Sequence, residues 1–297
     1  MRILNLGSLN FDKVYDVSHF VSEGETILSR GYGEFLGGKG LNQSIALARA
    51  GAEVYHAGAV GPDGEPLRAS LRDAGVDDRY LNQVETVSGH AIIQNAGSHN
   101  CIIVCGGANQ CVDCGYIRQV LSDFGEGDLL LLQNETSNVP FAMEEAHRRG
   151  MKIAFNASPI TAELMEYPME LVDYFLINEV EGKALSGVDS EDYQVILEGL
   201  FRRFPNAAIV LTVGEQGVLY RHKEIRESHG IYSVEAVDTT AAGDTFCGYF
   251  LTCLSKELPI SQALDIASRA SAIAVSRHGA SNSIPHWNEV LAFGAEK

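Results

Sequence analysis

A run of small residues followed by a single acid is the feature of this sequence best suited to chemistry. Residues 236–254, AVDTTAAGDTFCGYFLTCL, predict a small-residue turn that leads into a helix. The backbone N–H groups of Ala241, Ala242 and Gly243 would lie at the helix N-terminus, where free N–H groups and the helix dipole bind anions. Asp244 would stand beside a phosphate held there and could accept the proton of an attacking hydroxyl. An acid in the first turn also stabilises a helix by itself, so both interpretations of Asp244 remain open at this stage.

A second glycine cluster, FLGGKGLNQSIALARAGA at residues 35–52, also runs into an amphipathic helix. Its glycines and Lys39 have nearly the spacing of a P-loop, but Gly40 stands where that motif needs a metal-binding hydroxyl. We therefore exclude a P-loop NTPase. Gly38 and Gly40 would instead let the backbone approach a substrate closely, and Asn42 would offer its side-chain amide to substrate hydroxyls.

Short β-rich runs alternate with helical stretches and indicate the elements that position these groups. The runs cover residues 3–7, 129–133, 152–156, 174–178 and 208–214. Segments between them, such as 140–151 and 192–204, carry apolar residues at helical spacing. This alternation predicts an α/β fold, in which a mainly parallel central sheet is covered by helices on both faces in a three-layer sandwich.

Polar residues follow the carboxyl ends of several of these runs. They are Gln133, Asn134, Glu135, Asn156, Asn178, Glu181, Thr212 and Gly214. Each residue alone is typical of a turn or helix cap. Ligands of open parallel sheets bind outside the carboxyl ends of the strands, so several strands that deliver polar groups to one edge predict a binding site there.

Two segments, residues 11–35 and 88–104, do not fit the alternating pattern. The first is rich in Gly, Tyr and Phe, and the second has two alternating β segments around a Gly-Ser-His-Asn turn, which predicts a hairpin. We expect both insertions to form a small β lid on a single domain that spans residues 1–297.

Composition limits the classes of partner. The formal net charge of −17 disfavours nucleic acid, whose binding needs clustered Lys and Arg. No segment approaches the roughly 18 consecutive apolar residues of a membrane span, and the N-terminus is unlike a secretory signal, so a cytoplasmic location is expected. Cys101, Cys105, Cys111 and Cys114 lack standard zinc spacing, which favours free thiols over the alternative of a metal site.

Six segments, in order along nearly the whole chain, resemble motifs of the phosphofructokinase-B, or ribokinase-like, sugar kinase family. Residues 37–61 resemble its first signature, and DTTAAGD at residues 238–244 resembles its second. The other four are GSLNFD, NEVE, TVGEQG and AIAVSRHGASNSIP. The resemblance implies the family's fold and transfer of the γ-phosphoryl group of Mg·ATP to a primary hydroxyl of a small sugar, with D-ribose as the first expectation.

The resemblance also implies roles for single residues. Asp244 would be the general base, beside an anion hole made by Ala241, Ala242 and Gly243. The residues expected to bind sugar are Asp12, Gly38, Lys39, Asn42, Glu135 and Asp244. Those expected to bind ATP are Asn178, Thr212, Gly214, Gly217 and Gly243, with Glu181 acting on Mg²⁺ through water. An activating monovalent cation, K⁺, would be held largely by backbone carbonyls at Asp238, Thr240, Ala274, Arg277, Gly279 and Ser283.

Departures from the family pattern leave alternatives open. Tyr249 stands where a small residue is usual, Cys247 replaces a common Asn, and Asn134 replaces an apolar residue. Kinases for fructose, deoxyribose, a ketodeoxy acid or a nucleoside are therefore alternatives. From other classes, a catalytically silent sugar-binding protein and a nicotinamide dehydrogenase are alternatives, although no G-x-G-x-x-G follows the first strand. The exposed edge of the lid predicts a homodimer.

Overall fold

The expected strands lie side by side in one large sheet. The computed structural model describes residues 1–97 and 99–294, and within them nine strands follow the order β13-β12-β11-β10-β9-β8-β1-β4-β5. Their bounds are β1 Ile3–Leu6, β4 Val54–Val60, β5 Asp77–Gln83, β8 Leu129–Gln133, β9 Lys152–Asn156, β10 Tyr174–Asn178, β11 Ala208–Thr212, β12 Val218–His222 and β13 Ile225–His229. Strands from β11 to β5 run parallel, and β12 and β13 are antiparallel at one edge.

The five predicted β runs are confirmed as β1, β8, β9, β10 and β11, which occupy the middle of the sheet. The sequence of β8 shows why these runs are continuously apolar. Leu129 and Leu131 pack into the core on one face of the sheet, whereas Leu130 and Leu132 pack into the core on the other. A strand buried on both faces needs apolar side chains at every position.

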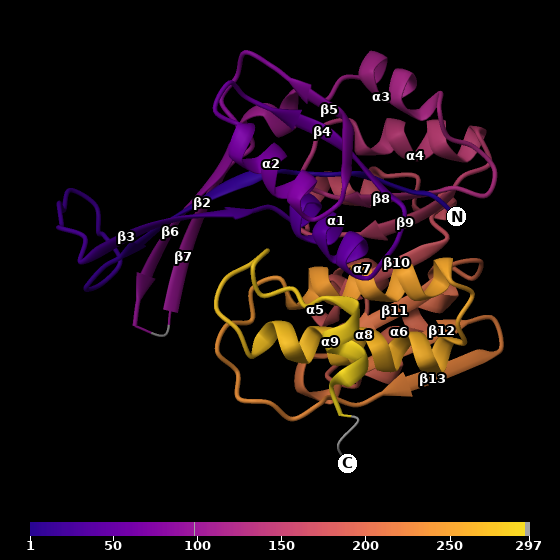
Figure 1. Cartoon of the computed structure of the whole chain (residues 1–297). Coiled ribbons are helices and arrows are strands. Elements are labelled where there is room, and N and C mark those ends of the chain that lie inside the picture. The colour runs from indigo at the N-terminus through magenta and orange to yellow at the C-terminus, as the bar shows by residue number, and fades with distance from the viewer. Residues whose placement is uncertain (98, 295–297) are drawn as a thin grey trace.

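Helices cover both faces and complete the expected three-layer fold (Figure 1). One face packs against α1 (Lys39–Arg49), α2 (Glu65–Asp73), α7 (Ala242–Ser255), α8 (Ile260–Val275) and α9 (Trp287–Ala292). The other packs against α3 (Cys114–Leu121), α4 (Val139–Arg148), α5 (Glu179–Ser186) and α6 (Tyr193–Arg203). Short 3₁₀ turns occur at Gly107–Cys111, Ala162–Glu166, Met169–Leu171 and Gly214–Gln216.

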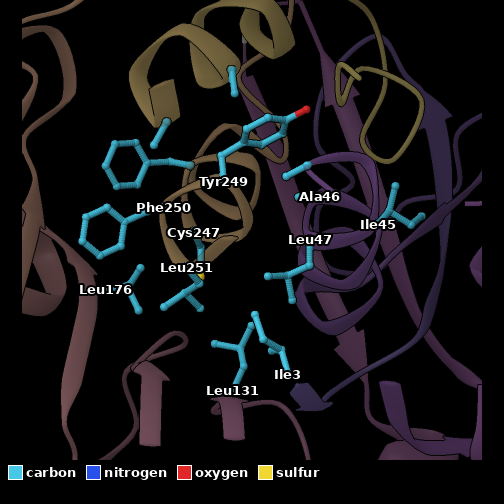
Figure 2. Packing of buried hydrophobic residues seen from close by; sticks show 14 of the residues in the cluster. Ile3, Ile45, Ala46, Leu47, Leu131, Leu176, Cys247, Tyr249, Phe250 and Leu251 are labelled. Atoms are coloured by element: carbon cyan, nitrogen blue, oxygen red, sulfur yellow. The ribbon is translucent and has the colours of Figure 1, made fainter. Parts of the chain in front are cut away.

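Helix α7 is buried along most of its length and packs against α1 above the sheet. Figure 2 shows Leu47 of α1 and Leu251 of α7 converging on Ile3 and Leu131 of the central strands. Burial on nearly every side explains why the sequence of α7 is apolar around its circumference rather than along one stripe.

Tyr249 of α7, at a position where a small residue was expected, is completely buried. Its hydroxyl donates to the carbonyl oxygen of Pro285 at 2.8 Å, and its ring stacks on that of Trp287 with centroids 6.1 Å apart. The large side chain therefore packs against the C-terminal segment.

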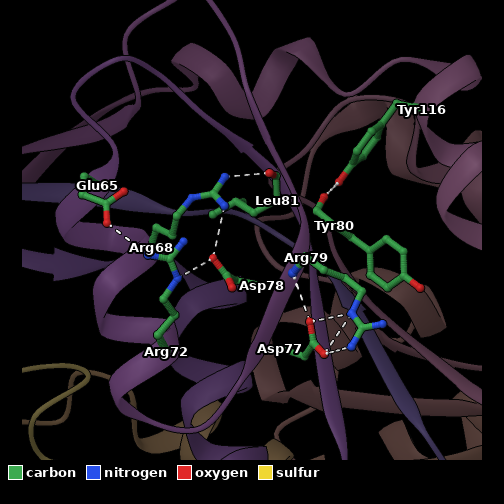
Figure 3. A network of polar contacts seen from close by, with 9 residues as sticks. All are labelled: Glu65, Arg68, Arg72, Asp77, Asp78, Arg79, Tyr80, Leu81 and Tyr116. Carbon is green, nitrogen blue, oxygen red and sulfur yellow. Dashed lines mark hydrogen bonds and ion pairs between the residues drawn. The ribbon is translucent and has the colours of Figure 1, made fainter.

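A polar network secures the β5 edge of the sheet (Figure 3). Arg68 and Arg72 of α2 both bind the carboxylate of Asp78, at 3.2 and 2.9 Å, and Arg68 also donates to the carbonyl oxygen of Leu81 at 2.7 Å. Charged side chains along an edge strand oppose its pairing with another sheet. This network therefore stabilises the fold at the β5 edge, which is separated from β9, β10 and β11 by β8, β1 and β4.

A small second sheet projects from one side of the molecule (Figure 1). It contains β2 (Asn10–Asp16), β3 (Gly31–Gly37), β6 (Gly89–Ala96) and β7 (His99–Cys105), in the order β3-β2-β6-β7. Strands β6 and β7 pair antiparallel as the predicted hairpin, although Ser98 of its expected turn lies outside the described residues. The fold class predicted from the sequence, including a separate small β-sheet, is confirmed.

The described residues contain no helix that is both long and apolar enough to cross a membrane. All six cysteines are free thiols. Across residues 1–97 and 99–294, no group of three or more His, Cys, Asp or Glu side chains is placed to hold a metal ion, so the cysteine cluster forms no such site there.

Candidate active site

Helix α7 begins at the small-residue turn that the sequence singled out. Ala241, the residue before the helix, has φ 60° and ψ 9°, a left-handed conformation that costs a non-glycine residue roughly 1–2 kcal/mol. The turn is closed by hydrogen bonds from the Ala242 N–H to the Thr239 carbonyl (3.3 Å) and from the Thr245 N–H to the Ala241 carbonyl (2.8 Å). No described side chain caps the helix. Because the Ala242 N–H already bonds to Thr239, the N–H groups of Gly243 and Asp244 are the ones left for an anion among the described residues, and backbone strain of this kind is typical of functional sites.

Asp244 lies in the first turn of α7 and is only 7% exposed. Its Oδ2 accepts a hydrogen bond from Asn42 Nδ2 at 3.0 Å, and its Oδ1 accepts one from Gln43 Nε2 at 2.8 Å. Both donors come from the first turns of α1, which packs beside α7. The carboxylate is therefore held in one orientation by neutral amides.

A pocket of about 220 Å³ opens between the N-terminus of α7 and the carboxyl ends of β9, β10 and β11. Its lining comprises Lys39, Asn156, Leu176, Ile177, Asn178, Glu181, Val210, Thr212, Thr239, Ala241, Ala242, Gly243, Asp244 and Phe246. The residues that the sequence assigned to catalysis thus line one cavity together with Asn178 and Thr212, two of those assigned to ATP binding. Its position at the carboxyl edge of a parallel sheet is where ligands of such folds bind.

Asn178 and Glu181 form a capping box at the start of α5. The Glu181 carboxylate accepts the Asn178 backbone N–H at 2.9 Å and side-chain Nδ2 at 3.0 Å, and Asn178 Oδ1 accepts the Glu181 N–H at 2.9 Å. Burial raises the pKa of Glu181. Mg²⁺ at nucleotide sites is commonly bound by one or two carboxylates, waters and phosphates, so one carboxylate at the pocket wall fits the water-mediated role expected of Glu181.

Lys39 supplies the positive charge of the pocket, being the one Lys or Arg among the described lining residues. Burial alone would lower its pKa, but the negative charges of Asp244, Glu135 and Glu181 outweigh burial and raise it. Burial in turn raises the pKa of Glu135, whose carboxylate accepts the Lys39 backbone N–H at 3.1 Å and the Ser8 hydroxyl. Because the protein is strongly acidic, this lysine is the group best placed to attract an anionic substrate.

Asp12 extends from β2 of the small sheet against Gly37, where a Cβ atom would lie only 2.1 Å from the carboxylate. Burial, and then the nearby charge of Glu135, raise the pKa of Asp12 to about 6. Asn42 Oδ1 is buried and has no hydrogen-bond partner in the described part of the chain. Gly38 precedes α1 with φ 96°, a conformation that favours glycine. The Asn42 oxygen beside Asp244 and the Asp12 carboxylate near Glu135 are acceptors suited to the hydroxyl groups of a polar ligand.

Three of the residues expected to bind ATP differ in their position relative to the pocket. Thr212, at the end of β11, lines the pocket. Gly214 and Gly217 are absent from the described lining. Gly217, at φ 93°, lies against the backbone of His229, whose carbonyl oxygen would be 2.1 Å from a Cβ atom. The close approach of β13 is therefore sufficient to explain this glycine.

Asp238 joins the two segments expected to hold a monovalent cation. Its carboxylate accepts the backbone N–H of Thr240 at 2.9 Å and that of Gly279 at 3.1 Å. The other expected residues, Ala274, Arg277 and Ser283, belong to the same C-terminal segment as Gly279. The two segments whose carbonyls were expected to hold the cation therefore meet beside the turn before α7. This arrangement fits a cation site.

Sequence reasoning missed Gln43, which contacts Asp244 directly, and Asn5, which lies behind it. The available signal was the polar run Asn42-Gln43-Ser44, which interrupts the small and apolar residues of 40–48. All three side chains are buried, and buried polar side chains require partners.

An acid beside an open helix N-terminus, with a lysine in the same pocket, is the arrangement of a small-molecule phosphotransferase. Comparison with known families agrees. The model of the pfkB family carbohydrate kinases matches residues 2–287, and the chain belongs to this family. The prediction of a carbohydrate kinase is thereby confirmed.

Relatives with known names cover nearly the full chain. The ribokinase of Haemophilus influenzae is 35% identical, with 97% of this chain and 96% of the relative covered. A deoxyribokinase of Salmonella typhi is 30% identical, with 98% and 99% covered. The structure of Arabidopsis thaliana ribokinase complexed with ribose and ATP matches with a TM-score of 0.85 and 25% identity, over 98% of this chain and 97% of that one.

Proposed function

We propose that the protein transfers the γ-phosphoryl group of ATP to the primary hydroxyl of D-ribose, giving ribose 5-phosphate and ADP. The observation that carries this proposal is the position of Asp244, buried beside Asn42 and directly at the open N-terminus of α7. The similarity to ribokinases, one of them complexed with ribose and ATP, supports ribose as the sugar.

The sugar would lie between the small sheet and α1. Its hydroxyls would donate to the carboxylates of Asp12 and Glu135 and to the unpartnered Oδ1 of Asn42. Gly38 would allow the backbone to approach the ring, and Lys39 would contribute from the start of α1. The small sheet would act as a lid whose closure excludes water and so limits ATP hydrolysis.

Asp244 would accept the proton of the primary hydroxyl as its oxygen forms a bond to the γ-phosphorus and the bond to the ADP oxygen breaks. Negative charge on the transferring group would be stabilised by the N–H groups around Ala242 and Gly243 and by Lys39. Mg²⁺, when bound, neutralises phosphate charge, and Glu181 and Asn178 would orient its waters. Thr212 would contact the nucleotide from the end of β11.

The test is a panel of acceptors assayed with Mg·ATP: ribose, 2-deoxyribose, fructose, a ketodeoxy acid and adenosine. We expect the highest kcat/KM for ribose, and phosphorus NMR of the product should place the phosphate on the primary carbon. A strong preference for adenosine, or for 2-deoxyribose, would overturn the assignment of ribose. Turnover of none of these compounds would favour a silent binding protein.

The role of Asp244 is tested by Asp244→Asn, which keeps the size of the side chain but removes the base. We expect kcat to fall by about 10²–10⁴-fold, the usual contribution of general base catalysis. Asp192→Asn is the matched control, because Asp192 is also an acid at a helix N-terminus, that of α6, and Asn serves equally well as a cap. Undiminished turnover by Asp244→Asn would contradict the mechanism.

A monovalent cation, K⁺, would bind between the turn at Asp238 and Thr240 and the segment that contains Ala274, Arg277, Gly279 and Ser283. The support is the Asp238 carboxylate, which accepts the Thr240 N–H within the turn and the Gly279 N–H from the C-terminal segment. The cation would stabilise the turn from which Ala241 enters α7, and thereby the anion hole.

A homodimer would form through the lid. Strand β7 is an edge of the small sheet, and its Ile102, Ile103 and Val104 side chains are 50%, 60% and 65% exposed. Exposed apolar edge strands pair readily with a second copy. Sedimentation analysis should give a dimer, and Ile103→Lys should shift it toward monomer.

A further inference from the structure

We infer that Gln43, on the buried side of α1, is a positioning residue that sets the orientation of the Asp244 carboxylate. This inference rests on the proposed role of Asp244 as the base. Gln43 is completely buried, and its Nε2 donates to Asp244 Oδ1 at 2.8 Å, while Asn42 Nδ2 holds Oδ2 at 3.0 Å. A base must present its lone pair along the path of the proton, so fixing the plane of the carboxylate is part of its preparation for reaction.

Gln43 is itself held by a chain of side-chain amides that leads to the central strands. Gln133 Nε2, at the end of β8, donates to Gln43 Oε1 at 2.7 Å and to Asn5 Oδ1 at 2.9 Å. Asn5 Nδ2, in β1, donates to the carbonyl oxygen of Gly40 at 2.8 Å. The chain thus connects the rigid centre of the sheet to the base.

The two ends of this chain determine the direction of every hydrogen bond in it. The Asp244 carboxylate and the Gly40 carbonyl can only accept, so Gln43 must turn its NH₂ group toward Asp244 and its oxygen toward Gln133. Gln133 lies at the centre of the chain of amides, and its NH₂ group donates one hydrogen to Asn5 and the other to Gln43. Flipping any of these amides would place two acceptors in contact in the protein interior, which is costly.

The chain carries no formal charge of its own. Asn5 Nδ2 also donates to Ser44 Oγ at 2.8 Å, and Ser44 Oγ lies 2.8 Å from Nδ1 of the buried His56. Burial lowers the pKa of His56 to about 3, so this ring is neutral at physiological pH. Gln43 therefore acts on the base through orientation and one hydrogen bond, rather than by supplying charge.

The titratable groups that face Asp244 are Lys39, Glu135 and Cys247. Burial raises the pKa of Cys247 and keeps that thiol neutral. Among the described residues, the side-chain hydrogen bonds to the two Asp244 oxygens come from Asn42 and Gln43. Removing the Gln43 donor should therefore be visible in the pH dependence of turnover.

Gln43→Met tests the inference, because Met has a similar length but cannot donate. We expect kcat to fall by about 10–100-fold with KM for sugar and ATP changed by less than about threefold, since the lost interaction orients the base rather than the substrates. The acid limb of the kcat profile should move to higher pH, because a carboxylate that loses a donor holds its proton more tightly. Gln43→Glu should move the limb further, because two adjacent carboxyls share a proton.

Ile45→Val is the matched control, since Ile45 is buried on the same helix but packs in the apolar core. It should lower the melting temperature without moving the acid limb. A folded Gln43→Met variant with wild-type kcat and an unmoved limb would overturn the inference. A fall in kcat accompanied by an equal rise in KM, with the limb unmoved, would show a merely structural role and would overturn it as well.

If Gln43→Met does not fold, side-chain amide NMR of the wild-type protein replaces it. We expect slowly exchanging Gln and Asn NH₂ resonances that shift along the acid limb of turnover and cease to do so in Asp244→Asn. The absence of any such titrating amide would overturn the inference. Failure of the proposed function is distinguishable, because it would appear as unimpaired turnover in Asp244→Asn or as no turnover of ribose by the wild-type protein.

Discussion

Gly248 of α7 lies directly against Ala46 of α1: a Cβ atom on Gly248 would be 2.4 Å from the Ala46 Cβ atom. One helical turn earlier on each helix, Asn42 and Asp244 meet through their hydrogen bond. The two helices therefore approach closely one turn from this hydrogen bond, and Figure 2 shows Ala46 and Leu47 facing α7 at this level. The separation of the helices therefore controls how the Asn42 amide meets the carboxylate of Asp244, the proposed base.

Gly248→Ala should weaken both stability and turnover. The contact distance is too short for a Cβ atom, and overpacking of a core costs about 1–3 kcal/mol, whereas Ala gains about 1 kcal/mol over Gly in helix propensity. We therefore expect a net loss of about 1 kcal/mol in the free energy of unfolding. Displacement of α7 from α1 should lower kcat by about tenfold, which urea denaturation and steady-state kinetics will measure together.

Gly115→Ala in α3 is the control for Gly248→Ala. There a Cβ atom would meet only the end of the Asp113 side chain, at 3.1 Å. Helix propensity should raise stability here by up to about 1 kcal/mol, and turnover should not change. Equal effects at both glycines would contradict the importance of close approach between α1 and α7.

The central strands and α7 could be predicted because their signals are local. A continuous apolar run such as that of β8 follows from burial on both faces, and a small-residue turn before an acid marks the start of α7. Strands β4 and β5 were not predicted. Strand β5 reads DDRYLNQ and has little local β signal, because as an edge strand it is stabilised by pairing with β4 and by the arginines of α2.

In the candidate site, too, the residues with a local sequence signal could be predicted and the others could not. Asn178, Glu181, Thr212 and the residues around Asp244 were found because motifs place them at the ends of strands and helices. The chain of amides behind Asp244 was not found, because Gln43 and Gln133 are far apart in the sequence and become neighbours only through the packing of α1 on the sheet. Pairing of this kind has no local pattern.

Asp12→Asn should stabilise the protein at pH 8 and weaken sugar binding. The pKa of Asp12 is about 6 in the folded protein, above its ordinary value of 3.8, so the folded protein retains this proton more tightly than the unfolded chain. Ionisation of Asp12 therefore reduces stability as pH rises through 6. The variant should melt at a higher temperature than the wild type at pH 8, and this difference should vanish near pH 4.

The cost of Asp12→Asn should appear in KM for the sugar, which we expect to rise by about 10–100-fold, because hydrogen bonds to charged groups contribute about 1.5–3 kcal/mol. For the same reason, wild-type affinity for sugar should decline below pH 6 as Asp12 becomes protonated. A variant that is no more stable at pH 8, or sugar binding that is unchanged between pH 5 and 8, would contradict this account.

Lys39→Met should lower kcat/KM for ATP by about 10²–10³-fold, because it removes a charge-stabilising donor from the pocket. The substitution also leaves Asp244, Glu135 and Glu181 without the cation that attracts them. Stability should therefore fall more at pH 8 than at pH 5, because the raised pKa values of Glu135 and Glu181 let these two carboxyls take up protons more readily at the lower pH. Lys152→Met, which removes only an exposed ion pair with Asp173, is the control and should change stability by less than about 1 kcal/mol.

Asp238→Asn should reduce activation by K⁺. Burial alone would raise the pKa of Asp238, but the Thr240 hydroxyl and the N–H groups of Thr240 and Gly279 outweigh burial and lower it, so the carboxylate remains charged and joins the two segments. An amide offers one acceptor oxygen, so one of these hydrogen bonds is lost at a cost of about 1 kcal/mol.

Turnover measured in K⁺ and in tetramethylammonium at equal ionic strength gives the activation ratio for each protein. We expect a ratio well above one for the wild type and one reduced severalfold in Asp238→Asn. Asp173→Asn is the matched control. Asp173 also accepts a backbone N–H from another segment, that of Ile153 at 2.9 Å, but both residues are far in the sequence from the turn. An unchanged activation ratio in Asp238→Asn would show that K⁺ activation does not depend on the turn that leads into α7. An equally reduced ratio in Asp173→Asn would show the same.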